Sequence, residues 1–261
     1  MLAEPNQSEQ NEAERGFVGY FDLLGYKNVL TNNHINKAIE VVKLIQQILE
    51  KEQERVYTAG KIVGQQFCEH IVYSDSILVY TTFPEANREQ HNQIGIFHEF
   101  CAALISELFW NGLPVRGAWA FGNYYVKRTA NGIYVAGIPI VEAYEFSSCL
   151  DLAGCVIAPS AEKILSDLKI LDPPLLGIVH CPVPLKGNQN QKSQKQEMFM
   201  LNHYKIDLNY NPNRKMSRQI VMQQFAEHNK SVGVEVLSKI NNTLEFLKAC
   251  EADACQPDEI D

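Results

Sequence analysis

The stretch Gly16–Tyr26, GFVGYFDLLGY, decides the fold together with Phe67–Thr82, FCEHIVYSDSILVYTT. In the first stretch an apolar run ends at Asp22 and then passes through a glycine into helical spacing, which is typical of a strand followed by a helix. In the second, two apolar runs are separated only by Tyr73–Asp75. A separation this short predicts a tight hairpin. Both predicted strand ends therefore carry an aspartate that has no packing reason to be there.

Outward from these stretches, hydrophobic spacing predicts the remaining elements. Helices are expected at 24–31, around 39–49, and at 87–111, 138–150 and 160–169, and strands at 115–121, 124–126, 132–136, 155–158, 175–180 and 197–201. A turn is expected at Gly122–Asn123. This order predicts an α+β sandwich with a mixed sheet, helices on one face, and the other face free for a partner.

The chain is expected to form one main domain at 16–205, followed by a C-terminal helical extension at 206–250. Residues 1–15 are predicted to be a disordered tail and residues 251–261 an acidic tail. The polar run GNQNQKSQKQ at 187–196 has no apolar anchor and is predicted to be a mobile hairpin tip.

Composition excludes several classes of protein. No run approaches the roughly 20 apolar residues of a membrane span, and the N-terminus does not have the pattern of a cleavable leader, so a cytoplasmic protein is expected. The formal charge of −8 argues against a general affinity for nucleic acid. The seven cysteines form no C-x-x-C pair, which favours reduced core thiols. The G-x-S-x-G, P-loop and Rossmann motifs are absent.

Asp22 and Asp75 together favour a site for a hard divalent cation. Mg²⁺ and Mn²⁺ take one or two carboxylates from a protein and leave other positions to water and substrate phosphates. If the first strand pairs with the hairpin, the two side chains meet at one edge of the sheet. The alternative is that each is an ordinary turn or cap residue, but for the pair we favour metal binding.

Positive and backbone groups near these aspartates are suited to a polyphosphate. Arg116 in PVRGAWAFG could clamp a phosphate, or lie in a surface ion pair. Lys186 in PVPLKGNQ could serve as a point charge for a terminal phosphate, or be a solvated lysine. The backbone at Leu24, Gly25 and Tyr26 offers the N–H groups of a helix start, which seat anions, although a lone glycine there is more often a cap or turn.

In combination these motifs resemble the class III nucleotidyl cyclase catalytic domain. Its F-x-D-x-x-G pattern corresponds to Tyr20–Gly25, with Tyr20 at the aromatic position. Its second aspartate lies in a hairpin, usually after a glycine, where this chain has Ser74. Val115–Ala118 is similar to the family's strand with a phosphate-contacting arginine, and Leu185–Gly187 to its closing LKG hairpin. The resemblance spans about 16–202.

The resemblance implies a ferredoxin-like βαββαβ core and a site with two Mn²⁺ or Mg²⁺ ions. Asp22, Asp75 and the backbone carbonyl of Leu23 would hold the metal, while Arg116 and Lys186 would stabilise charge on the leaving pyrophosphate. Because the family builds its site between two protomers, the resemblance also implies a homodimer.

Departures from the family pattern fall on the half of the site that selects the base. Ile71 and Tyr134 stand at positions that read a purine in the family, and Val141, Glu142 and Glu145 stand where a helical Asn and Arg are expected. Tyr57, expected near the start of the second strand region, is a candidate for contacting the base, as are Ile71 and Tyr134.

The motif YSDS followed by VRGA resembles the pyrimidine cyclases of the Pycsar antiphage systems. That resemblance implies cyclisation of UTP or CTP to cyclic UMP or CMP, with the product acting on a separate effector protein. The missing Asn and Arg leave a second hypothesis, a degenerate cyclase-like domain that binds nucleotide without chemistry. A polymerase-like palm domain shares the paired aspartates, but the LKG hairpin and the lack of a broad basic surface argue against it.

Overall fold

The computed structural model describes residues 13–63, 68–171, 177–186, 194–210, 214 and 216–254. The elements, in chain order, are β1 (Glu14–Leu23), α1 (Tyr26–Asn32), α2 (Ile35–Val63), β2 (Glu69–Tyr73), β3 (Ser76–Thr82), α3 (Asn87–Trp110), β4 (Val115–Thr129), β5 (Gly132–Gly137), α4 (Ile138–Cys149), β6 (Gly154–Ile157), α5 (Pro159–Asp167), β7 (Ile178–Leu185), β8 (Gln194–Leu201), α6 (His203–Tyr210), α7 (Arg218–Ala226) and α8 (Val234–Ala254). The predicted 187–196 hairpin tip lies largely outside the described residues.

The strands form one mixed sheet in the order β2-β3-β1-β4-β6-β8-β7, with β5 paired to the far part of β4. β1 pairs antiparallel with both β3 and β4, whereas β4 and β6 run parallel. The first strand in the chain is therefore an inner strand of the sheet, with the β2–β3 hairpin on one side and β4 on the other. The predicted mixed α+β sheet with C-terminal helices is confirmed.

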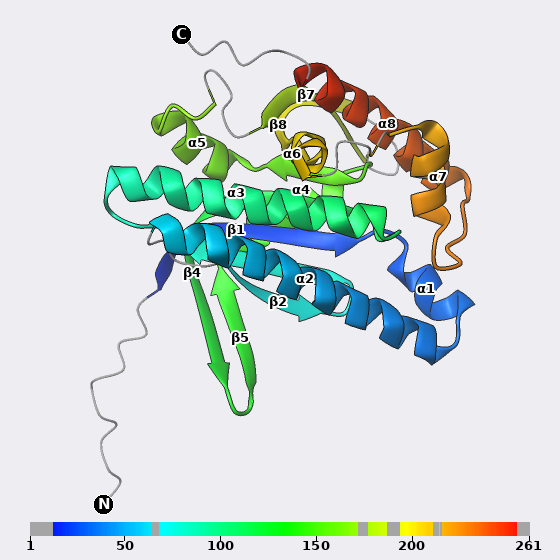
Figure 1. Ribbon diagram of the computed structural model, residues 1–261, viewed down its shortest axis with the longest axis horizontal. Helices are drawn as coiled ribbons and strands as arrows, with labels where there is room; N and C mark the ends of the chain where they lie inside the picture. Colours follow the sequence, from blue (N-terminus) through cyan, green and yellow to red (C-terminus); the bar gives the residue numbers. More distant parts are fainter. Residues whose placement is uncertain are drawn as a thin grey trace, which may run out of the picture.

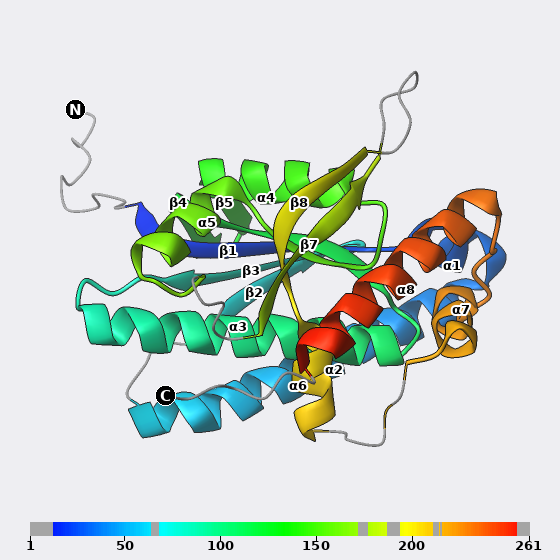
Figure 2. The ribbon, with the colours of Figure 1, turned by 90° about the horizontal axis from the view of Figure 1, so that it is seen from above.

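Helices cover both faces of the sheet. Alternate residues of a strand point to opposite faces, and Phe17 and Phe21 of β1 lie in the larger core with α2 and α3. Val18 and Tyr20 face the opposite side, where Tyr144 of α4 packs edge-on against Tyr20. Figure 2 shows α4 on one side of the sheet and α2 and α3 on the other. The long helices α2 and α3 lie on one face as predicted, but the face predicted to be free for a partner is covered by α4, the helix predicted at 138–150.

The strand β4 is longer than predicted. Gly122 and Asn123, predicted to form a turn, continue the strand and pair with Gly16 and Arg15 of β1. The pairing extends this far because β1 begins at Glu14, inside the tail predicted at 1–15. That predicted tail therefore ends too late, and residues 1–12 lie outside the described residues. Beyond Glu14, where β1 begins, β4 and β5 continue as a projecting hairpin (Figure 1).

The C-terminal helices pack on the end of the sheet and on α3. α6 contacts α3, and α8 crosses α6, α7 and β7 (Figure 1). α6 begins at His203, so it spans the predicted boundary at 205, and α8 reaches Ala254. In the part of the chain that the structure describes, no helix is long and apolar enough to cross a lipid bilayer.

Two buried histidines make the stability of this fold dependent on pH. Burial lowers the pKa of His98 and of His203 to about 4, whereas a histidine in an unfolded chain titrates near 6.5. Between these pH values the unfolded state binds protons that the folded state does not. The free energy of unfolding is therefore highest above pH ~6.5 and decreases as the pH falls towards 4.

We expect the free energy of unfolding, measured with urea, to fall by about 2 kcal/mol per histidine between pH 7 and pH 5. The variant His98→Gln should show a smaller fall over the same interval, because one of the two proton-linked groups is gone. Equal unfolding free energies at pH 7 and pH 5 would contradict the burial of these imidazoles.

Candidate functional site

The end of β1 brings Asp22 and Arg116 together. Asp22 is the register partner of Arg116 on β4 and of Ser76 on β3. Arg116 donates through Nε at 2.8 Å and lies 2.7 Å away through Nη2, in both cases to Oδ2 of Asp22. The two side chains are only 18% and 19% exposed. Because Asp22 and Arg116 are register partners on two paired strands, the backbone pairing alone places their side chains next to each other.

Asp75 lies beside this pair. The Leu23 N–H donates to the Asp75 carbonyl at 2.9 Å, which ties the β2–β3 turn to the end of β1. Within the described residues the Asp75 carboxylate has no hydrogen-bond or ion-pair partner. Burial raises the pKa of Asp22, the Arg116 charge opposes that rise, and the negative charge of Asp75 adds to it. The two carboxylates therefore interact electrostatically across the strand end.

The Leu23 carbonyl is directed towards the same turn. The N–H and C=O of one residue in a strand point to the same side, and the Leu23 N–H points to Asp75. No group of three or more His, Cys, Asp or Glu side chains in the described part of the chain is placed to hold a metal. The donors here are two carboxylates and one carbonyl. The chemistry of that set suits a hard divalent ion that keeps water or phosphate oxygens in its other positions, and the binding of such an ion here stays a prediction.

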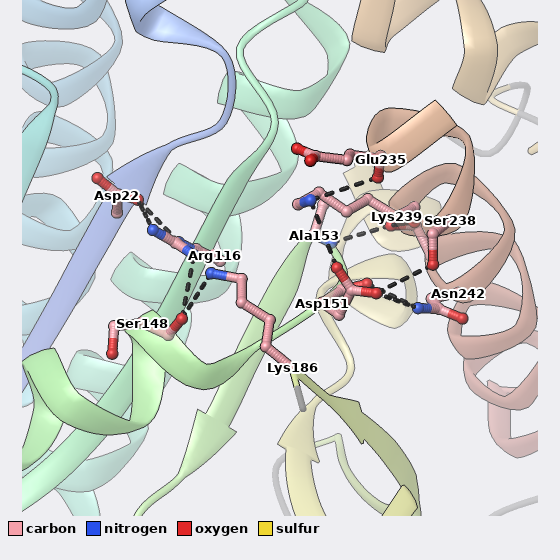
Figure 3. A network of polar contacts seen from close by, with 11 residues as sticks. Asp22, Arg116, Ser148, Asp151, Ala153, Lys186, Glu235, Ser238, Lys239 and Asn242 are labelled. Atoms are coloured by element: carbon pink, nitrogen blue, oxygen red, sulfur yellow. Dashed lines mark hydrogen bonds and ion pairs between the residues drawn. The ribbon is translucent and has the colours of Figure 1, made fainter. Parts of the chain in front are cut away.

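A single carbonyl gathers the two cations of the site. The Ser148 carbonyl accepts from Lys186 Nζ at 2.6 Å and from Arg116 Nη1 at 3.1 Å. Ser148 lies in the last turn of α4, where the unsatisfied carbonyls form the negative end of the helix dipole. Figure 3 shows the resulting chain from Asp22 through Arg116 and Ser148 to Lys186. Sequence reasoning missed Ser148 because a backbone acceptor carries no residue-type signal.

The loop that follows Ser148 is held by α8. The Asp151 carboxylate accepts from Ser238 at 3.0 Å and from Asn242 at 3.1 Å, and it lies 3.4 Å from Lys239 Nζ. All three partners belong to α8 (Figure 3). On the other side of the loop, the Asp151 N–H donates to the Pro184 carbonyl at the end of β7. The C-terminal helix thus supports the segment that presents Ser148.

The turn predicted to seat phosphate is shaped by glycine, but one of its donors is used. Gly25 has φ +80, a left-handed conformation that glycine adopts without strain. The Leu24 N–H donates to the Pro114 carbonyl at 2.8 Å, so the prediction that Leu24 offers this group to a phosphate is wrong. Tyr26 is buried in the core below the turn, and burial raises its pKa.

The three candidate base contacts do not lie together. Ile71 on β2 packs beside Leu78, on the same face of the sheet as Tyr20. Tyr134 is 55% exposed on the projecting β5. Tyr57, predicted near the start of a strand, lies in α2 on the opposite face of the sheet, because 35–63 is one continuous helix and β2 begins only at Glu69. The structure therefore does not bring Tyr57 to the site.

The residues that replace the expected Asn and Arg lie on the outer side of α4. Val141, Glu142 and Glu145 line an open groove with Gly137 and Ile138. Glu142 accepts from the Ser160 N–H at 3.1 Å, so its carboxylate already has a structural partner at the start of α5. These side chains do not contact the Asp22–Arg116 pair in the structure.

The turn that carries Asp75 contains a strained residue. Ser74 has φ +56, a conformation that costs a residue with a Cβ about 1–2 kcal/mol. We expect Ser74→Gly to leave the free energy of unfolding unchanged or to raise it by up to about 1 kcal/mol, since glycine removes the strain but gains freedom in the unfolded chain. Ser74→Val should lower it by about 1–2 kcal/mol. Chemical denaturation of both variants tests this, and a harmless valine would contradict the turn geometry.

Comparison with known proteins gives similarity at the level of structure. No protein-family model matches the chain, and no curated protein matches it by sequence. Among solved structures it is similar to the adenylyl cyclase CyaB from P. aeruginosa, with a TM-score of 0.46 and 11% identity over 72% of this chain and 94% of that one. It is similar to the guanylyl cyclase domain of the RhoGC fusion protein from the aquatic fungus Blastocladiella emersonii, with a TM-score of 0.45 and 14% identity over 72% and 95%. It is also similar to a class III adenylyl cyclase-like ATP-binding protein from Pseudomonas aeruginosa, with a TM-score of 0.42 and 14% identity over 58% and 34%. At these identities the overlap assigns no role to any residue of this chain.

Proposed function

We propose that this protein is a metal-dependent pyrimidine nucleotide cyclase that converts UTP or CTP to 3′,5′-cyclic UMP or CMP and pyrophosphate. The observation that carries the proposal is the placement of Asp22 at the strand end joined to the Asp75 turn, beside Arg116 and Lys186, which share one acceptor. This combination of hard anionic ligands and fixed cations suits a metal-bound triphosphate. The motifs Tyr20–Gly25 and Val115–Ala118 support the same assignment.

The metal would be held by Asp22, Asp75 and the Leu23 carbonyl. Mn²⁺ or Mg²⁺, two ions per site by the family resemblance, would supply positive charge and lower the pKa of the ribose 3′-hydroxyl. Among the described residues beside the pair, no side chain is suited to act as a general base. Tyr20 is engaged with Ser76 at 2.6 Å, and burial raises its pKa.

Arg116 and Lys186 would bind and orient the phosphates. A guanidinium has five N–H donors and an ammonium has three. Arg116 uses Nε and Nη2 on Asp22 and Nη1 on Ser148, and Lys186 uses one donor on Ser148. Both groups therefore keep donors for phosphate oxygens while their positions are fixed. Prearranged donors of this kind stabilise charge on leaving pyrophosphate without having to reorganise during the reaction.

The choice of a pyrimidine rests on the residues that depart from the family. Ile71 places an apolar side chain on the same sheet face as Tyr20, where the resemblance calls for a charged purine-reading residue. The further biological setting is part of the proposal and rests on resemblance alone. In that setting the enzyme acts in the cytoplasm during phage infection, and the cyclic product acts on a separate effector.

An exposed apolar surface on α4 and β5 supports a homodimer. Exposed large hydrophobic residues gather on α4 and β5, namely Ile138, Val141, Tyr144, Ile133, Tyr134 and Val135. Exposed apolar patches of this kind mark interaction surfaces. We propose that a second copy covers this surface, which would bring Tyr134 of the projecting hairpin to the neighbouring protomer.

A nucleotide-binding domain without chemistry is the second candidate function. The outward-facing Glu145 and the structurally engaged Glu142 on α4 favour it, because they stand where the family has an Asn and an Arg that steady the transition state. Such a domain would keep the carboxylates and cations of the site and lack turnover.

The function is tested by incubating the protein with an equimolar mixture of nucleoside triphosphates and Mn²⁺ and analysing the products by mass spectrometry. We expect cyclic UMP or CMP and pyrophosphate. Asp22→Asn and Asp75→Asn should each lower kcat/KM at least about a hundredfold, because each removes an anionic ligand. Asp167→Asn, on an exposed aspartate at the end of α5, should have no effect.

Nucleotide binding without product would favour the second candidate. A cyclic purine product would reject the pyrimidine assignment. If no triphosphate binds in the presence of Mn²⁺, both functions are wrong.

The dimer is tested with a charge on its surface. Ile138 is 82% exposed at the start of α4, and Val234 is 84% exposed at the start of α8. We expect Ile138→Asp to convert a dimer to a monomer in size-exclusion chromatography with light scattering, and to abolish turnover with it. Val234→Asp is the matched control and should stay dimeric. A wild-type protein that is active as a monomer would contradict the dimer.

A further inference from the structure

Lys230 is buried between the C-terminal helices and two turns near the site. These are the β1–α1 turn at Gly25 and the α3–β4 turn at Gly112. Only 6% of the residue is exposed. Its Nζ donates to the Gly112 carbonyl at 2.6 Å and to the Gln224 carbonyl at 3.3 Å. Its aliphatic stem lies against Gly25, where an added Cβ would be only 2.9 Å from Lys230 Cδ. One side chain thus contacts both the α3–β4 turn and the β1–α1 turn.

These two turns adjoin the strand ends that carry the ion pair between Asp22 and Arg116. Gly25 follows Asp22 by three residues, and Gly112 precedes Arg116 by four. The turns are also joined directly, since the Leu24 N–H donates to the Pro114 carbonyl at 2.8 Å. Movement of either turn would therefore shift the strand end on which Asp22 or Arg116 lies.

The segment just before Lys230, which contains His228 and Asn229, is held by hydrogen bonds to Asn33. Asn33 donates to the His228 carbonyl at 2.9 Å, and Asn229 donates to Asn33 Oδ1 at 2.7 Å. His228 and Asn229 both have φ +59, an unfavourable conformation for residues with a Cβ that these contacts hold in place. A side chain on Gly112 would collide with Glu227, so the turn and this segment pack closely.

We propose that Lys230 is a positioning residue for the candidate site, holding the turns at Gly25 and Gly112 so that Asp22 and Arg116 keep their register. The proposal rests on the proposed function for its catalytic consequence. It assigns a role to the C-terminal helices, which the sequence presents only as an appendage. Burial lowers the pKa of Lys230 to about 7, and the cost of burying an amine agrees with a placement that serves the turns.

The test compares Lys230→Met with two controls. Methionine keeps an unbranched stem beside Gly25 and removes the donor to Gly112. Lys248→Met makes the same substitution on the exposed side of α8. Ile240→Val shortens a fully buried side chain in α8 without touching the turns, and it controls for general loosening of the C-terminal helices.

The first readout is hydrogen exchange of the backbone amides of Leu24, Asn28 and Val29, which donate to Pro114 or Gly25. In Lys230→Met we expect at least tenfold faster exchange at these amides, with the central amides of β1 unchanged. If exchange there matches Lys248→Met, or if the increase is spread over the whole sheet as in Ile240→Val, the proposal is overturned.

The second readout is turnover of UTP and CTP with Mn²⁺, measured well below the unfolding temperature of each variant. We expect kcat/KM of Lys230→Met to fall at least tenfold and that of both controls to stay within twofold of wild type. A normal kcat/KM in Lys230→Met would overturn the catalytic consequence. If the wild-type protein shows no turnover, the proposed function fails, while the exchange comparison still decides the role of Lys230.

Should Lys230→Met fail to fold, Asn33→Ala provides the same comparison. It removes the contacts to His228 and Asn229 and leaves Lys230 itself intact. Because Asn33 also donates to the Val29 carbonyl of α1, the Leu24 amide is the readout here. We expect faster exchange at Leu24, and unchanged exchange there would overturn the proposal.

Discussion

The ion pair between Asp22 and Arg116 is the interaction on which the candidate site depends. Its two members sit opposite each other on paired strands, with nitrogen to oxygen distances of 2.7 and 2.8 Å. Removing one partner would leave a charge that is largely shielded from water, and such a charge is costly. The ion pair also depends on the position of β1 inside the sheet. From there the strand places Asp22 next to both β3 and β4.

A backbone carbonyl holds the two positively charged side chains of the site together. Arg116 reaches from Asp22 to the Ser148 carbonyl, which also holds Lys186. The negative end of α4 therefore balances part of the positive charge that the site keeps for a ligand. The Asp75 carboxylate remains without a partner in the described residues, and burial raises the pKa of Asp22, with a further rise from the negative charge of Asp75. A bound divalent ion would relieve that repulsion.

The C-terminal helices support the site from two directions. α8 holds the loop at Asp151, next to Ser148 (Figure 3). Lys230, between α7 and α8, packs behind the turns that precede Arg116 and follow Asp22. Because both supports act on backbone segments, the helices can influence the site without placing a side chain in it.

The sequence by itself determined that β1 ends next to Asp22, that Asp75 lies in a tight hairpin between β2 and β3, and that the fold is mixed α+β, because hydrophobic spacing and turn residues act locally. It placed Tyr57 near the start of a strand, inserted a turn at Gly122, and left one sheet face free where α4 packs, because each of these depends on a partner distant in the chain. Only the tertiary structure decided that Arg116 meets Asp22, that Ser148 joins the two cations, and that Lys230 lies behind them. These contacts are made by register and by backbone carbonyls, and neither is written in the type of any single residue.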